Sequence, residues 1–199
     1  MNSIFNIVYC CCFAVVFSSC VRGQAMEDSV PELEISPSAA FSSERQLVFE
    51  EELTKIKQFL AANKSYNQEV VMLIDMKIPS GNYRFFIYDT KKDSIIHRAL
   101  VAHGSGSVTG EEDLVFSNVP NSYQTSLGKY KIGKSYSGSF GKSYKLHGLE
   151  STNNKAYERA IVLHPYSCVP DEEQPYEICE SLGCPMVSNE FMKTLYSVI

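Results

Sequence analysis

The stretch Val70–Ala102, VVMLIDMKIPSGNYRFFIYDTKKDSIIHRALVA, decides the interpretation of the fold. It contains three runs rich in aliphatic and aromatic residues, at 70–76, 83–88 and 95–102. Turn-forming residues fill the two gaps between these runs, at 79–82 and 90–93. Short apolar runs joined by short turns are typical of strands, so the stretch predicts an antiparallel meander of three strands.

Helices are expected on both sides of the strand-rich region. At its N-terminal side, Ser43 and Gln46 match the two ends of a capping box. The apolar residues that follow recur at helical spacing, at Phe49, Leu53, Ile56 and Leu60. Near the C-terminus, Ser188 can cap a second helix that has one apolar face.

Further short strands are expected at 127–132, 144–147 and 160–164. A long loop rich in Gly, Ser and Asn precedes them at 103–126, and loops of this length in a compact domain are often functional. The sequence therefore predicts a mainly β domain with flanking helices at its two ends, over residues 44–199.

The N-terminal segment has a different composition. Residues 1–20 include an almost wholly apolar run that is short for a membrane span and is typical of a secretion signal. The segment Phe17-Ser18-Ser19-Cys20 resembles a lipoprotein box, in which Cys20 would be lipidated and anchor the chain to a membrane. Ordinary cleavage after Ala25 is the alternative. Both readings predict an exported protein of the periplasm or cell envelope, with residues 21–43 as a flexible linker.

Charge narrows the range of partners. The chain has 18 Lys and Arg against 23 Asp and Glu, which gives a formal net charge of −5 at pH 7. No basic stripe is visible, so nucleic acid is not an expected partner. The 44% of hydrophobic residues is enough for one globular core.

Export changes the interpretation of the seven cysteines. Those at 10–12 lie in the predicted signal and would leave with it, while Cys20 is the candidate for lipidation. Cys168 and Cys179 are eleven residues apart in one predicted loop, so a disulfide between them is plausible in an oxidising compartment. Cys184 would then be unpaired.

Cys184 lies between Gly183 and Pro185, where a sharp turn would expose its sulfur. Backbone N–H groups of Gly183, of Cys184 or of a neighbouring loop could then point at a developing oxyanion. A thiol attacks as the thiolate, and an adjacent imidazole promotes this by taking the proton and remaining as a cation beside the sulfur. Three histidines could supply this imidazole, namely His103, His147 and His164. From these residues alone, Cys184 is either a nucleophile or an inert buried thiol.

Several motifs, taken in order, resemble the bacterial L,D-transpeptidases. Ser181-Leu182-Gly183-Cys184-Pro185 looks like the S/T-x-G-C signature of that family, and Thr125–Ile132 is similar to its T-P-x-G-x-Y-x-I strand motif. The closer match is a variant branch, the murein L,D-transpeptidase catalytic-domain family, over residues 45–190. Its marks here are Val101-Ala102-His103-Gly104, Phe116-Ser117-Asn118, Ser126-Leu127-Gly128, Gly148-Leu149-Glu150, Asn153 or Asn154, Ala156, Arg159 and Ile161-Val162-Leu163-His164.

The resemblance implies an L,D-transpeptidase-like β-sandwich or barrel in which Cys184 is the nucleophile and His164 its base. The carbonyl of Pro165 would orient the imidazole, Ser181 would line the site, and Gly183 would help to shape it. The implied substrate is a peptidoglycan stem tetrapeptide. Cys184 would attack the carbonyl of its third residue and release D-Ala, and an amine of a second stem would resolve the thioester. Neither a metal nor a cofactor is implied.

Two departures from the better-known branch affect substrate anchoring. That branch has His where this chain has Leu182, and Arg where this chain has Met186. Arg159 or Lys142 could supply the missing cation for a substrate carboxylate. His147 and His103 could shape the acceptor side, or could be structural.

Other functions stay open at this point. Water could resolve the thioester, which would make the protein an L,D-carboxypeptidase, or the fold could serve a non-catalytic lipoprotein that binds the cell wall. A zinc site of histidines and a cysteine has no short H-x-x-H or C-x-x-C spacing in its favour. A papain-like peptidase is disfavoured because every histidine precedes Cys184, and a sortase because no arginine follows it.

Overall fold

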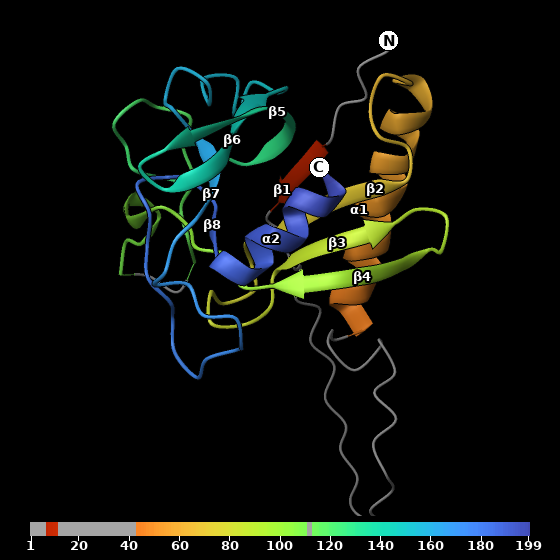
Figure 1. Cartoon of the computed structure of the whole chain (residues 1–199). Coiled ribbons are helices and arrows are strands. Elements are labelled where there is room, and N and C mark those ends of the chain that lie inside the picture. The colour runs from red at the N-terminus through yellow and green to blue at the C-terminus, as the bar shows by residue number, and fades with distance from the viewer. Residues whose placement is uncertain (1–6, 12–42, 111–112) are drawn as a thin grey trace, which may run out of the picture.

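The computed structural model of the 199-residue chain describes residues 7–11, 43–110 and 113–199 (Figure 1). Eight strands, two α-helices and one short 3-10 turn lie within these residues. In chain order they are β1 Ile7–Cys11, α1 Ser43–Ala62, β2 Val70–Asp75, β3 Phe85–Asp89, β4 Ser94–Ala99, η2 Ser105–Ser107, β5 Gly128–Gly138, β6 Gly141–Gly148, β7 Val162–Pro165, β8 Met186–Val187 and α2 Asn189–Val198. The prediction of a mainly β domain with a helix at each end is confirmed.

The strands form one sheet in the order β4-β3-β2-β1-β5-β6-β7-β8. All pairs are antiparallel except β1 with β2 and β7 with β8. Helix α2 contacts both halves of this sheet: Phe191 packs on Phe85 of β3, and Tyr196 lies 6.3 Å from Tyr144 of β6. Because β2, β1 and β5 separate those two strands, the sheet must curl around the helix, as Figure 1 shows.

The predicted meander forms β2, β3 and β4, and both faces of β2 are buried. Val71 and Leu73 face helix α1, while Met72 and Ile74 belong to the cluster that contains α2. The four apolar residues predicted to form the stripe of α1 are all buried, with 3% or less of their surface exposed: Phe49, Leu53, Ile56 and Leu60. A strand covered on both sides needs a continuous apolar run, which is what made this stretch recognisable.

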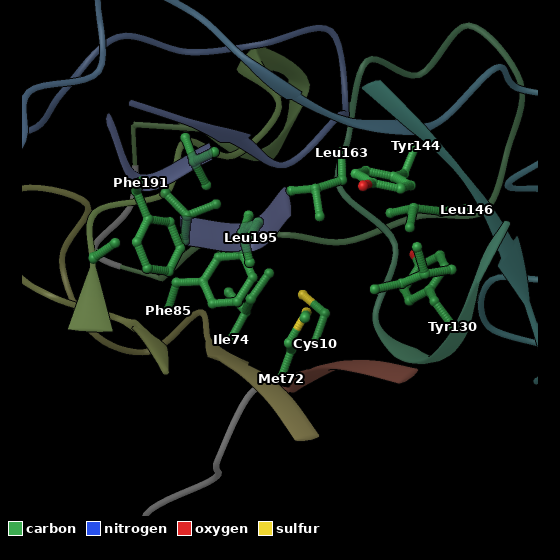
Figure 2. Packing of buried hydrophobic residues seen from close by; sticks show 14 of the residues in the cluster. Cys10, Met72, Ile74, Phe85, Tyr130, Tyr144, Leu146, Leu163, Phe191 and Leu195 are labelled. Atoms are coloured by element: carbon green, nitrogen blue, oxygen red, sulfur yellow. The ribbon is translucent and has the colours of Figure 1, made fainter. Parts of the chain in front are cut away.

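The main core lies inside the curl of the sheet (Figure 2). Phe85, Leu163 and Leu195 each have 0% of their surface exposed and come from β3, β7 and α2. The ring centroids of Phe85 and Phe191 are 5.2 Å apart in an edge-to-face arrangement. Ser188 caps α2 as expected, because its side chain accepts a hydrogen bond from the Phe191 N–H. The packing of α2 therefore holds the short strands β7 and β8 in place.

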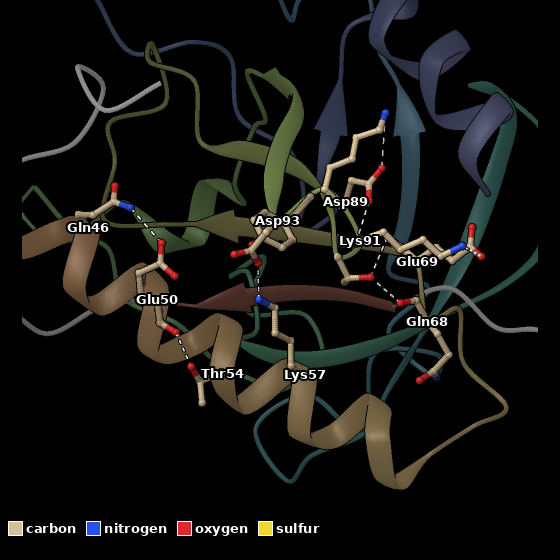
Figure 3. A network of polar contacts seen from close by, with 12 residues as sticks. Gln46, Glu50, Thr54, Lys57, Gln68, Glu69, Asp89, Lys91 and Asp93 are labelled. Carbon is tan, nitrogen blue, oxygen red and sulfur yellow. Dashed lines mark hydrogen bonds and ion pairs between the residues drawn. The ribbon is translucent and has the colours of Figure 1, made fainter. Parts of the chain in front are cut away.

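A polar network covers the outer side of α1 and the neighbouring turns (Figure 3). The Lys57 ammonium lies 2.5 Å from a carboxylate oxygen of Asp93, and Lys91 lies 2.5 Å from Glu69. These side chains are solvent-exposed, so each pair contributes only about 0–1 kcal/mol to stability. The buried stripe beneath the network therefore holds α1 on the sheet.

Strand β1 lies within the segment predicted to be a secretion signal. It pairs with β2 through Val8 and Met72, and with β5 through Tyr9 and Lys129. Cys10 is 4% exposed and belongs to the main core, whereas the sequence suggested that it leaves with the signal. A signal core and a buried central strand need the same apolar composition, so the sequence alone does not separate them.

Cleavage of a signal, which would remove β1, stays a prediction. Cys20, Ala25 and all but the last residue of the predicted linker lie outside the described residues. Among the helices that the structure describes, none is both long and apolar enough to cross a membrane.

Candidate active site

Strands β7 and β8 bring His164 and Cys184 to the same place. His164 is paired with Met186 in parallel register, and Cys184 comes two residues before Met186. The Val162 N–H at the start of β7 lies 3.4 Å from the Cys184 sulfur. Val162 and His164 are two residues apart, which is about 7 Å along a strand. The structure therefore places Cys184, just before β8, against the first residue of the strand that carries His164, although 20 residues separate the two in the sequence.

The His164 ring is fixed by three neighbours. Its Nδ1 lies 3.1 Å from the Pro165 carbonyl oxygen, so Nδ1 carries the hydrogen and Nε2 keeps a lone pair. Phe140, in the turn between β5 and β6, stacks on the ring with centroids 4.2 Å apart, and Tyr166 packs edge-on against Phe140. His164 is 2% exposed. Burial lowers the pKa of this imidazole, and the hydrogen bond to Pro165 offsets only part of that effect, so the ring is a neutral base at pH 7.

The Cys184 thiol is partly exposed, and nearby groups contact its sulfur. It accepts a hydrogen bond from the Val162 N–H and directs its own S–H at the Ala160 carbonyl, 3.8 Å away. Burial raises the pKa of this thiol, while the Val162 N–H and the charge of Arg159 lower it. The net direction is upward, so the thiol is neutral at rest, as is the His164 imidazole. An imidazolium next to a thiolate was expected from the sequence, and burial of both groups explains why the structure differs.

The segment before Cys184 forms a tight turn that Ser181 holds together. The Ser181 hydroxyl accepts from the Gly183 N–H at 3.0 Å and donates to the Cys184 carbonyl at 2.6 Å. Gly183 has φ +112°, and a Cβ there would lie 3.0 Å from the Gln124 carbonyl oxygen. Only glycine adopts this backbone without strain. The motif therefore sets the direction in which Cys184 projects.

The same turn decides which N–H can stabilise an oxyanion. The Gly183 N–H is already bonded to the Ser181 hydroxyl and is not free to do so, which corrects one of the donors expected from the sequence. Among the described residues, no acceptor contacts the Cys184 N–H. Of the donors that the sequence named in this turn, the Cys184 N–H is therefore the one available to a developing negative charge.

Arg159 holds the long loop at 103–126 against this turn. Its guanidinium donates to the Ser117 carbonyl at 2.8 Å and to the Gln124 carbonyl at 2.5 Å, with the Ser126 hydroxyl 3.3 Å away. A Cβ on Gly183 would lie 3.4 Å from its Nη2. These contacts use the donors that a substrate carboxylate would need, so Arg159 acts chiefly as a support. The sequence did not reveal this role because its partners are 33–42 residues away.

Lys142, the other candidate to anchor a carboxylate, lies over the Tyr196 ring of α2 at 4.4 Å. His147 on β6 stacks on Tyr157 with centroids 4.8 Å apart. Burial lowers the pKa of His147, and the charges of Lys131 and Lys145 lower it further. Both side chains are thus held against aromatic rings, and a role for either in binding a substrate stays a prediction.

His103 lies beside the turn, where its carbonyl accepts from the Ser181 N–H at 2.8 Å. Its ring is 3% exposed, and its Nδ1 accepts from the buried Arg84 guanidinium at 2.8 Å. Within the described part of the chain, no three His, Cys, Asp or Glu side chains gather as a metal site would require. The three histidines therefore have different neighbours: Phe140 stacks on His164, Tyr157 stacks on His147, and Arg84 donates to His103.

Cys168 and Cys179 form a disulfide, with their Cα atoms 6.1 Å apart. It closes part of the irregular segment that connects β7 to β8, between His164 and Cys184. Glu177, just before this bridge, hydrogen-bonds to the backbone and hydroxyl of Ser80. The connecting segment is thus attached to the meander, which restrains the approach of Cys184 to β7.

The curled sheet, with Cys184 against the first residue of the strand that carries His164, defines a β-rich domain. A family model described as L,D-transpeptidase catalytic domain matches residues 42–199, and the chain belongs to this family. Members of the family act on peptidoglycan. Comparisons with curated proteins and with solved structures gave no match.

Proposed function

We propose that the protein is an L,D-transpeptidase in which Cys184 is the nucleophile and His164 its general base. The observation that carries this proposal is the geometry of β7. Its first N–H contacts the Cys184 sulfur, and the imidazole two residues later has its tautomer set by the Pro165 carbonyl. A neutral imidazole with an available Nε2 lone pair is the form that accepts a thiol proton.

The proposed reaction proceeds in two steps on a peptidoglycan stem tetrapeptide. The Cys184 sulfur attacks the carbonyl carbon of the third residue while its proton moves to Nε2 of His164. The Cys184 N–H stabilises the oxyanion, and the peptide bond to the terminal D-Ala breaks. The D-Ala nitrogen takes the proton from His164 and leaves. An amine of a second stem then attacks the thioester and gives its proton to His164. The new peptide bond forms as the carbon–sulfur bond breaks, and His164 passes the proton to the departing Cys184 sulfur.

The neutral resting pair favours a thiol that is deprotonated during attack over one that is ionised beforehand. A buried ion pair would have to overcome the desolvation that raises the pKa of Cys184 and lowers that of His164. The Cys184 thiol is partly exposed, so a substrate can reach it from solvent. Ser181 and Gly183 position the nucleophile, and Phe140 covers the imidazole against water.

Two further functions remain compatible with the family. Hydrolysis of the same thioester by water would release a tripeptide, and a domain without activity could still bind stem peptides. Incubation of the full chain with a disaccharide-tetrapeptide, followed by mass spectrometry of the products, separates them. We expect loss of D-Ala together with a cross-linked dimer. Tripeptide alone would indicate hydrolysis, and unchanged substrate would exclude both reactions.

The variant Cys184→Ala should give no product while its melting temperature stays close to that of the wild type. In the full chain produced without export, which keeps Cys10, the matched control is Cys10→Ala, because it removes a thiol from the core and leaves the contacts of Cys184 intact. Full activity of Cys184→Ala would end the assignment of the nucleophile. A carbapenem should add its mass to the wild type and to Cys10→Ala, but not to Cys184→Ala.

We also propose that the chain is exported and anchored through a lipid on Cys20. The supporting observation is the apolar segment that ends in Phe17-Ser18-Ser19-Cys20. Mass spectrometry of the protein purified from the membrane fraction should find a lipidated N-terminal Cys20. A mature N-terminus after Ala25 would exclude the anchor and keep export, and an intact Met1 would exclude both.

A further inference from the structure

A cavity of about 340 Å³ lies next to the turn formed by residues 181–184. Cys184 is not among the residues that line it. Arg84 and His103 form its floor, with 0% and 3% of their surfaces exposed. Its rim carries exposed side chains, among them Asp113 and Glu180. The volume lies at the lower end of the range for sites that hold small molecules.

The floor of the cavity contains a buried hydrogen-bond donor. Nδ1 of His103 accepts from Arg84, so the hydrogen of the neutral ring is on Nε2. Burial, followed by the charge of Arg84, lowers the pKa of His103 to about 4, which keeps the ring neutral at pH 7. Among the described residues, no acceptor lies within hydrogen-bonding distance of Nε2. Buried donors of this kind are normally satisfied, so a ligand acceptor fits this position.

Charge varies from the floor to the rim. The buried Arg84 guanidinium carries the positive charge of the floor, and the Glu177 carboxylate is its main counter-charge. The N–H groups of Arg84 are held by the carbonyls of Val101 and Ile78 and by His103. The rim carries the carboxylates of Glu177 and Glu180. Lys77 at the rim is already paired with Asp113 at 2.6 Å. A ligand with an anionic end inward and a cationic end outward matches this distribution.

We propose that this cavity binds a small zwitterion of the α-amino acid type, with its carboxylate on His103 Nε2 and its ammonium at Glu177 and Glu180. The site is separate from the reacting thiol, yet it adjoins the turn that carries it. The His103 carbonyl accepts from the Ser181 N–H, and Gly104 packs so closely on Gly183 that a Cβ would lie 2.7 Å from the Gly183 Cα.

D-Alanine is the first probe, and ¹⁵N-edited NMR of the histidine side chains is the measurement. Titration of the full chain with D-alanine should shift the His103 Nε2 resonance to saturation in the millimolar range. Acetate supplies only the carboxylate and ethylammonium only the cation, so both should bind more weakly than D-alanine. No shift at 50 mM D-alanine would overturn the proposal and assign Nε2 to a water molecule. Equal affinity for acetate and D-alanine would show that the ammonium group is not recognised, and would overturn the proposal of a zwitterionic ligand.

Three variants test the placement of the ligand. Glu180→Gln, a change at the exposed rim, should weaken D-alanine about threefold and leave acetate unchanged. His103→Phe should weaken both by about tenfold or more, with His97→Phe on β4 as the matched control. Should His103→Phe fail to fold, the Glu180→Gln result decides alone. Cys184→Ala should bind D-alanine with the affinity of the wild type. This result separates a test of the cavity from a test of the catalytic role of Cys184.

Discussion

Replacement of Ser181 by alanine tests the turn that presents Cys184. The hydroxyl joins the Gly183 N–H and the Cys184 carbonyl through bonds of 3.0 and 2.6 Å, and Ser181 is 6% exposed. Its removal leaves one donor and one acceptor without partners, and each costs about 1 kcal/mol or more. The variant should therefore lose about 2 kcal/mol of unfolding free energy, which lowers the melting temperature by about 4–8 °C for a chain of this size.

The same change should reduce kcat/KM for the tetrapeptide by about 10–100-fold, because a nucleophile displaced by about 1 Å loses up to about 100-fold in rate. Scanning calorimetry and a D-Ala release assay measure the two effects. Ser181→Thr keeps the hydroxyl and should restore most of both, while Ser137→Ala on the exposed end of β5 should change neither. Wild-type melting and wild-type activity in Ser181→Ala would refute the role given to this turn.

Three further predictions concern the thiol, the disulfide and the first strand. Because burial raises its pKa, Cys184 should react with iodoacetamide at a rate that keeps rising above pH 9, and a plateau below pH 7 would instead reveal a preformed ion pair with His164. The double variant Cys168→Ser, Cys179→Ser should lose about 3 kcal/mol of unfolding free energy by chemical denaturation, as expected for so short a loop, and no loss would show that the bridge does not stabilise the fold. A chain of residues 21–199 should fold but melt below the full chain because it lacks β1, and equal melting would show that the sheet does not depend on that strand.

Local patterns predicted most of the scaffold. The meander, the stripe of α1 and the Ser188 cap each depend on residues that are close in the sequence, and each is present in the structure. The two-residue strand β8 and the extension of β5 to Gly138 were not predicted. Residues 133–143 are rich in Gly and Ser, and they form strands because they pair with each other across a tight turn.

The sequence predicted the residues of the candidate site but not their protonation states. The sequence pointed to Cys184, His164 and the Pro165 carbonyl. In the structure the Pro165 carbonyl contacts the His164 ring, and Cys184 contacts the first residue of the same strand, while their catalytic roles stay predictions. The stacking of Phe140 on His164 and the support from Arg159 were missed, because both join segments more than 20 residues apart. The neutral state of the thiol and the imidazole depends on burial, which no short motif encodes.

The chemical claim at the centre of this account is an acyl bond to one sulfur. Acid-quenched full chain, taken during turnover of a tetrapeptide, can be digested and mapped by mass spectrometry. The account predicts an adduct of the tetrapeptide minus D-Ala on Cys184, which is absent in Cys184→Ala and strongly reduced in His164→Ala. Turnover without that adduct, or an adduct on a different residue, would contradict it.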